Sequence, residues 1–127
     1  MSEMVVGGIP IGNVGFTTAV HWAQRVVVVA ASGDLDALTA PGLTDAIHAA
    51  ASKKPTGLVV DLSNVRFLGS AGINVLLAAH REMTSAARFG VVADGPATSR
   101  PLRLIGIDDI IVIYPSLDEA LADFATA

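Results

Sequence analysis

The stretch GLVVDLSNVRFLGSAGINVLL, residues 57–77, decides the fold because its apolar pattern changes partway along. The β-branched run at residues 57–62 is typical of a central strand. Beyond it, apolar residues recur at helical spacing and predict a helix that begins near Ser70 and ends at about Thr84. This stripe consists of Ile73, Leu76, Leu77, His80 and Met83. A strand followed by a helix is the unit from which α/β folds are built.

The alternation of strands and helices continues in both directions along the chain. Upstream, a strand with one buried face is predicted by the alternation of Phe16, Thr18, Val20 and Trp22 with smaller or polar residues. The unbroken apolar run at residues 26–31 predicts a buried strand, and the spacing of apolar residues at 40–52 predicts a helix. Downstream, residues 88–93 and 110–114 predict strands, and between them lies a short helix with Pro101 in its first turn and Ser99 as its cap. Ser116 and Glu119 have the spacing of a capping box for a last helix.

This order of elements predicts a single α/β domain. Its sheet would be mixed, partly parallel and of about five strands, with about four helices packed over it. Residues 1–15 contain four glycines and a proline without periodicity, so we expect a flexible arm there and the domain at residues 16–127. Asp61 would lie at the carboxyl end of the central strand, where open α/β sheets place their sites.

Composition excludes several classes of function. Hydrophobic residues make up 52% of the chain, yet the longest unbroken apolar stretch is residues 26–31, far short of the roughly 20 residues of a membrane helix. No secretory signal is visible, and the chain has no cysteine, so we expect a cytoplasmic protein without membrane insertion, disulfides or thiolate metal sites. The net charge of −4 disfavours nucleic acid as a partner.

Ser70 stands between glycines at the start of the predicted helix. A nucleophile elbow needs glycine two positions before the serine, where this chain has Leu68, so the elbow is absent and nucleophilic catalysis is disfavoured. The hydroxyl could cap the helix, worth about 1 kcal/mol. Gly69 and Gly72 would also let another protein's active site approach it. A phosphate at a helix N-terminus is stabilised by about 0.3–1 kcal/mol, so phosphorylation would act on a partner and leave the fold intact.

Three stretches resemble the anti-sigma factor antagonists of the STAS domain class. They are SGDLDALTAPGL, VVDLSNVRFLGSAGINVLL and TSRPLRLIGIDDIIVIYPSLDEAL, and the resemblance covers roughly residues 16–124. Its most specific part is the spacing of D-L-S, then F, then S-A-G. The resemblance implies a STAS fold and a protein that binds an anti-sigma factor and so frees a sigma factor for transcription. It implies no enzymatic activity and no cofactor, because the partner would be a serine kinase that supplies ATP and Mg²⁺.

The resemblance also assigns the site residues. Ser70 matches the serine that the anti-sigma factor phosphorylates, and a phosphatase would restore the binding form. Asp34 and Asp36 match the family's acidic loop, where they could orient the serine, contact the partner or simply form the turn. Asp61 matches a family aspartate for which we expect a structural role. By proximity to Ser70, we expect partner contacts from Leu68, Gly69, Ile73 and Asn74.

Gly69 and Ala71 depart from the family pattern. Many members have an acidic residue before the serine and a second hydroxyl residue after it, so Ser70 is the only acceptor in this loop. The departure leaves an alternative function open, a STAS interaction subunit of a stress-signalling scaffold or transport complex that is not phosphorylated. A small ligand-binding enzyme is a third hypothesis, for which we find no catalytic constellation. Monomer and weak homodimer both remain compatible with the sequence.

Overall fold

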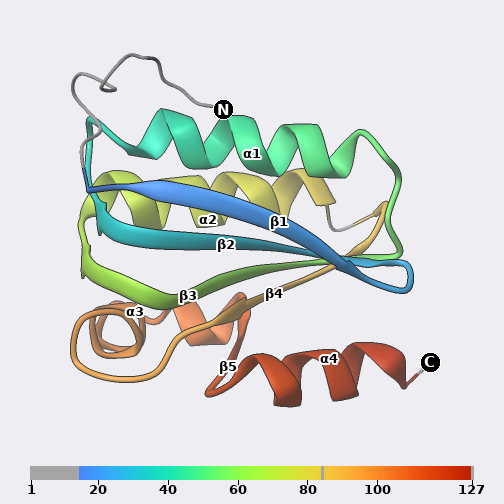
Figure 1. The fold of residues 1–127 in the computed structure, drawn as a ribbon. Helices are drawn as coiled ribbons and strands as arrows, with labels where there is room; N and C mark the ends of the chain where they lie inside the picture. The colour runs from blue at the N-terminus through green and yellow to red at the C-terminus, as the bar shows by residue number, and fades with distance from the viewer. Residues whose placement is uncertain (1–14, 84, 127) are drawn as a thin grey trace, which may run out of the picture.

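The computed structural model describes residues 15–83 and 85–126 (Figure 1). Of the predicted arm at residues 1–15, all but Gly15 lies outside the described residues. The elements in chain order are β1 (Thr17–Ala23), β2 (Val26–Leu35), α1 (Ala40–Ala51), β3 (Gly57–Leu68), α2 (Ser70–Met83), β4 (Arg88–Val92), α3 (Ser99–Leu104), a 3-10 turn (Ile107–Asp109), β5 (Val112–Tyr114) and α4 (Leu117–Ala125).

The strands form one sheet in the order β1-β2-β3-β4-β5, in which β1 is antiparallel to β2 and every other neighbouring pair is parallel. Helices α1 and α2 lie along one side of the sheet and α4 along the other (Figure 1). The predicted fold class, a mixed sheet of about five strands with about four helices, is therefore confirmed over the described residues.

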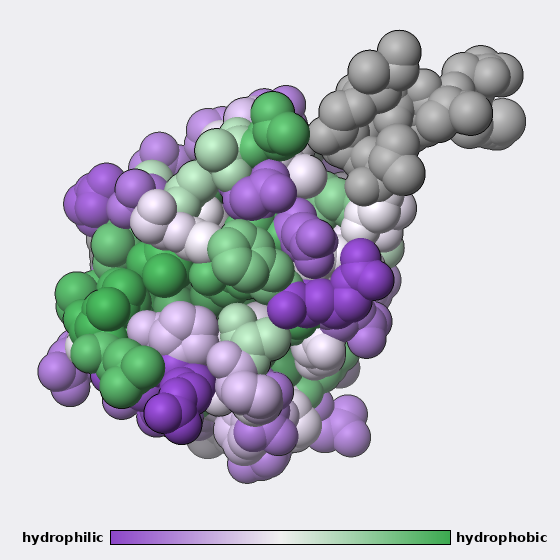
Figure 2. Space-filling model, turned by 90° about the vertical axis from the view of Figure 1, so that its left-hand side faces the viewer, coloured by the Kyte–Doolittle hydropathy of each residue, from purple (hydrophilic) through white to green (hydrophobic). Residues whose placement is uncertain are grey.

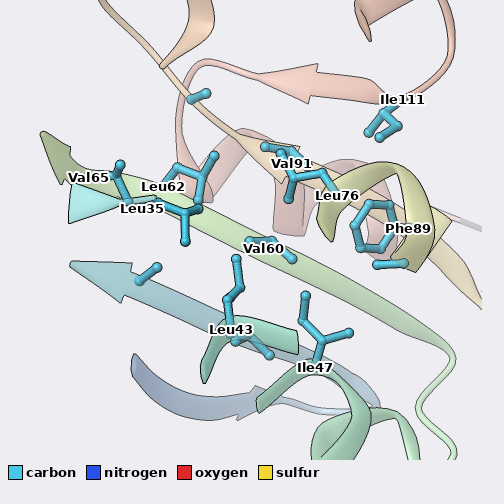
Figure 3. Packing of buried hydrophobic residues seen from close by; sticks show 14 of the residues in the cluster. Leu35, Leu43, Ile47, Val60, Leu62, Val65, Leu76, Phe89, Val91 and Ile111 are labelled. Carbon is cyan, nitrogen blue, oxygen red and sulfur yellow. The ribbon is translucent and has the colours of Figure 1, made fainter. Parts of the chain in front are cut away.

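The larger apolar cluster packs β3 between its neighbours and the helices (Figure 3). Val60 and Leu62 of β3 lie in it with Leu43 and Ile47 of α1 and Leu76 of α2, and none of these side chains is more than 1% exposed. Burial of each such side chain contributes about 1.5–3 kcal/mol. Val59 belongs to a second cluster under α4, so β3 is buried on both faces, as the β-branched run predicted for a central strand.

β1 differs from the predicted strand with one buried face. Val20 and Trp22 pair with residues of β2 that face the larger cluster, yet they remain 48% and 38% exposed. Only Phe16, just before the strand, is buried against α1, where a Cβ on Gly42 would lie 3.8 Å from its ring. The reason is cover: over the described residues β1 is an edge strand paired with β2 alone, and the cluster beneath α1 and α2 takes its strand residues from β2, β3 and β4 and none from β1.

Two further expectations are corrected by hydrogen bonding. β3 continues to Leu68, so Asp61 lies within the strand, where its carboxylate accepts hydrogen bonds from the backbone N–H and hydroxyl of Ser63. Ser99 does not cap α3, because its hydroxyl bonds the backbone of Gly95. By contrast, the predicted Ser116 cap of α4 is present, since its hydroxyl accepts the Glu119 N–H at 3.2 Å.

Packing of α2 against the core should require glycine at position 72. A Cβ at this position would lie 2.6 Å from Leu35 Cγ and 2.9 Å from Leu68 Cδ1, both side chains being buried. We expect Gly72→Ala to lower the free energy of unfolding by about 1–3 kcal/mol, measured by urea denaturation. Gly42 occupies the same third position of α1, and a Cβ there would meet only the Phe16 ring, at an ordinary van der Waals distance of 3.8 Å, so Gly42→Ala should leave stability unchanged or raise it by up to about 1 kcal/mol. Equal effects of the two substitutions would contradict this packing.

The contact of α4 with β5 should depend on pH. Burial, reinforced by a hydrogen bond that the hydroxyl donates to Asp123, raises the pKa of Tyr114 from 10.0 to about 12. The folded chain then keeps this proton where the unfolded chain loses it, so the stabilisation is complete below pH 10 and is lost between pH 10 and about 12. Because the chain has one tyrosine, ultraviolet titration of tyrosinate should give a midpoint well above 10 in the folded protein and near 10 in denaturant. A folded-state midpoint near 10 would show that the hydroxyl is not held in this way.

Candidate functional site

Ser70 is the first residue of α2 and is exposed. The preceding residue, Gly69, donates its N–H to Leu35 O at 2.9 Å and accepts the Ile73 N–H at 3.1 Å, so the backbone on both sides of the serine is fixed. Over the described part of the chain, the Ser70 hydroxyl has no hydrogen-bond partner, and the predicted side-chain cap is therefore absent. Gly69 holds the cap position, and the serine presents a free hydroxyl to solvent.

A bulge in β3 brings the preceding residues to the surface. Val65 pairs with Gly33 and Phe67 pairs with Asp34, so Arg66 is the extra residue between them. Bulges of this kind bend a strand and redirect its side chains. Gly33 has a φ of +105° and a Cβ there would lie 1.7 Å from Gly15 O, so only glycine permits this backbone path.

Phe67 is the residue that sequence reasoning missed. Its side chain is 53% exposed, although it lies in a strand beside buried neighbours. A Cβ on Gly69 would be 3.0 Å from Phe67 Cε2, so the ring lies directly over the glycine that precedes Ser70. A side chain at position 69 would have to displace that ring. The spacing of the motif included this phenylalanine, but no signal in the sequence indicated the bulge that exposes it.

The two aspartates of the acidic loop have different surroundings. Asp36 Oδ1 accepts the backbone N–H groups of Leu38 and Thr39 at 3.0 and 3.1 Å, which fixes the turn that leads into α1. Asp34 is exposed and pairs with Arg66 at 3.8 Å. Because it is the register neighbour of Phe67, Asp34 belongs to the surface beside Ser70, while Asp36 shapes the loop.

The predicted contact residues around Ser70 separate into two groups. Leu68 and Ile73 are 6% and 9% exposed and belong to the larger apolar cluster, so they hold the loop from below and offer little surface to a partner. Direct contact of these two residues with a partner, which was expected from proximity in the sequence alone, stays a prediction. Asn74 is exposed one helical turn after Ser70 and therefore lies on the same side of α2.

The face that carries these residues is mixed in polarity. Figure 2 views the molecule from the side where β2 and β3 end and α1 and α2 begin, and it shows apolar surface interrupted by polar side chains. Leu38 is 76% exposed in the loop before α1 and adds a second large apolar side chain to that of Phe67. A central apolar contact with polar groups around it is the usual composition of a protein–protein interface.

Two other kinds of feature, a metal centre and a membrane-spanning helix, are not found among residues 15–83 and 85–126. No group of three or more His, Asp or Glu side chains there could hold a metal ion. No helix in the same ranges is long and apolar enough to cross a membrane.

Comparison with known proteins identifies the family and agrees with the fold. A model of the STAS domain family matches residues 18–120. The anti-sigma-F factor antagonist RsfB of Mycobacterium tuberculosis is 41% identical over 109 residues, which cover 86% of this chain and 88% of RsfB. The crystal structure of an anti-sigma factor antagonist from Mycobacterium paratuberculosis is 45% identical, covers 87% of this chain and 94% of its own, and superposes with a TM-score of 0.83.

More distant structures share the fold. The anti-sigma factor antagonist SpoIIAA in its unphosphorylated form superposes with a TM-score of 0.72 at 18% identity, covering 87% of this chain and 98% of its own. The family model matches most of the described domain. The match to RsfB extends over 88% of the length of that protein. The chain therefore belongs to the STAS domain family, whose members include these anti-sigma factor antagonists.

Proposed function

We propose that this protein binds an anti-sigma factor and thereby frees a sigma factor for transcription, and that phosphorylation of Ser70 ends the binding. The observation that carries this proposal is the Ser70 hydroxyl, which is exposed and without a partner among the described residues, on a backbone that hydrogen bonds fix on both sides. The names of RsfB and of the M. paratuberculosis protein support antagonism of an anti-sigma factor. The partner would be an anti-sigma factor with serine kinase activity, acting in the cytoplasm, and a phosphatase would reverse the modification.

A phosphate on Ser70 would suit the fold of this chain. It would stand at the N-terminus of the 14-residue helix α2, where the helix dipole favours negative charge by about 0.3–1 kcal/mol. The hydroxyl has no hydrogen bond within the described residues that the modification would break. The effect would fall on the partner, because a hundredfold loss of affinity needs only about 2.7 kcal/mol and an unpaired, desolvated phosphate costs at least that much.

The contact surface would centre on Phe67 and Ser70. Asn74 and Asp34 would stand at its edge, Gly69 would lie beneath the Phe67 ring at its centre, and Leu68 and Ile73 would support it from the core. An aromatic ring that is half exposed and held over a glycine can enter a pocket of the partner at low cost in conformational entropy.

Intact-mass measurement tests the phosphorylation site. Incubation with a cognate anti-sigma kinase and ATP should add one phosphate to the wild type and none to Ser70→Ala. Ser85, exposed just beyond the other end of α2, provides the matched control, and Ser85→Ala should gain the phosphate in full. An undiminished gain on Ser70→Ala would refute the assignment. Binding of the anti-sigma factor without any phosphate gain on the wild type would instead identify an interaction subunit that is not phosphorylated.

Phe67→Ala tests the contact surface. We expect it to weaken binding of the anti-sigma factor about tenfold or more, measured by calorimetry, because truncation of a central aromatic hot-spot residue costs about 2 kcal/mol or more. Stability should change little, since half of the ring is already in water. Val112 is 56% exposed on the far edge strand β5, and Val112→Ala should leave the affinity unchanged. Equal affinity of the two variants would place the interface elsewhere.

A further inference from the structure

β1 leaves one edge of the sheet open over the described residues. Its seven residues pair with β2 in an unbroken register, and no described strand pairs with its outer side. Soluble proteins usually protect such an edge with Lys, Pro, a bulge or a short strand. The sequence TTAVHWA has no lysine, no proline and no carboxylate, and its register shows no bulge. Within the described part of the chain, the backbone groups of this exposed edge are thus available to another strand.

The hairpin determines which backbone groups point outward. Ala23 pairs with Val26 across the two-residue turn Gln24–Arg25, and the residues that flank a two-residue hairpin loop form a hydrogen-bonded pair. Hydrogen-bonded and non-hydrogen-bonded pairs alternate along an antiparallel ladder. Thr18, Val20 and Trp22 therefore direct their N–H and C=O groups away from β2, toward the open edge.

The same three residues also share one side of the sheet. They pair with Ala31, Val29 and Val27, which belong to the cluster beneath α1 and α2. Val20 and Trp22 are 48% and 38% exposed there, so an apolar strip runs along the outer edge of the strand. A partner strand would gain both backbone hydrogen bonds and contact with these side chains.

We propose that the open edge of β1 pairs antiparallel with β1 of a second copy of this chain, about a twofold axis at Val20. Val20 is the central residue of the strand, so this register pairs all seven residues of each copy. Thr18 then lies opposite the partner's Trp22, and Val20 lies opposite the partner's Val20. The two residues of each pair exchange two N–H···O=C hydrogen bonds, because their backbone groups point toward the open edge.

Charge favours the second copy as the occupant. The chain carries a net charge of −4, which opposes general association, whereas β1 carries no Lys, Arg, Asp or Glu and can meet its own copy without like charges in opposition. The opposite edge is a poorer candidate, since β5 has three residues and follows Asp108 and Asp109 closely. The result is one continuous sheet through two copies of the domain.

Sedimentation equilibrium and light scattering test this pairing. An edge-to-edge contact is small, so the mass should rise from 13.0 kDa toward twice that value across a concentration range of roughly 1–500 μM. Val20→Lys should abolish the rise by placing two ammonium groups opposite each other at the axis. Val112→Lys is the matched control, an exposed valine on the other edge strand, and should behave as the wild type.

A second variant, Val20→Pro, and a second measurement, tryptophan fluorescence, test the pairing independently of Val20→Lys. Val20→Pro deletes only an outward-facing N–H, so the β1–β2 ladder and the thermal stability should be kept while association is lost. Trp22 is the only tryptophan, and its emission should shift to shorter wavelength as the wild type is concentrated and stay constant in Val20→Pro. A wild type that stays monomeric throughout the range, or a dimer that survives Val20→Lys and is lost in Val112→Lys, would overturn the proposal.

Discussion

The hydrogen bond from Gly69 N–H to Leu35 O is the interaction on which the site depends. It joins the last residue of β2 to the residue after β3 and so determines where the central strand stops and α2 starts. The buried side chains of Leu35 and Leu68 close the space beneath it, and Gly72 is the residue small enough to pack over them. Because hydrogen bonding and core packing fix this junction, Ser70 is exposed to solvent and still held in a defined position.

The two glycines around Ser70 serve different contacts. Gly72 admits the core side chains of β2 and β3 against α2, whereas Gly69 admits the ring of Phe67 on the outer surface. The departure from the family pattern at Gly69 thus has a structural counterpart: the position before the serine has no acidic side chain and is covered in part by an aromatic ring. A partner of this protein would meet an apolar group there. The selectivity of the protein for its partner should reflect that difference.

Periodicity predicted the architecture well, because burial controls both the pattern and the fold. The stripe from Ile73 to Met83 predicted α2, and the β-branched run at residues 57–62 predicted the buried part of β3. What periodicity could not show was the bulge at Arg66, since an extra residue in a strand is defined by its partner strand and leaves no local pattern. That bulge is why Phe67 was missed, whereas β3 continues past Asp61 because its residues 64–68 go on pairing with β2. Exposure of β1 was missed for a similar reason: alternation reports which side chains share a face, but not whether anything covers that face.

The central claim is that phosphorylation of Ser70 changes recognition and leaves the fold unaltered. Its most direct test is a calorimetric titration of the cognate anti-sigma factor with fully phosphorylated and unphosphorylated protein, with the Tm of each form measured in the same buffer. We expect about a hundredfold weaker binding of the phosphorylated form and nearly equal Tm values, since the phosphate meets the favourable end of α2 and displaces no hydrogen bond among the described residues. Equal affinity of the two forms, or a large fall in Tm on phosphorylation, would contradict it.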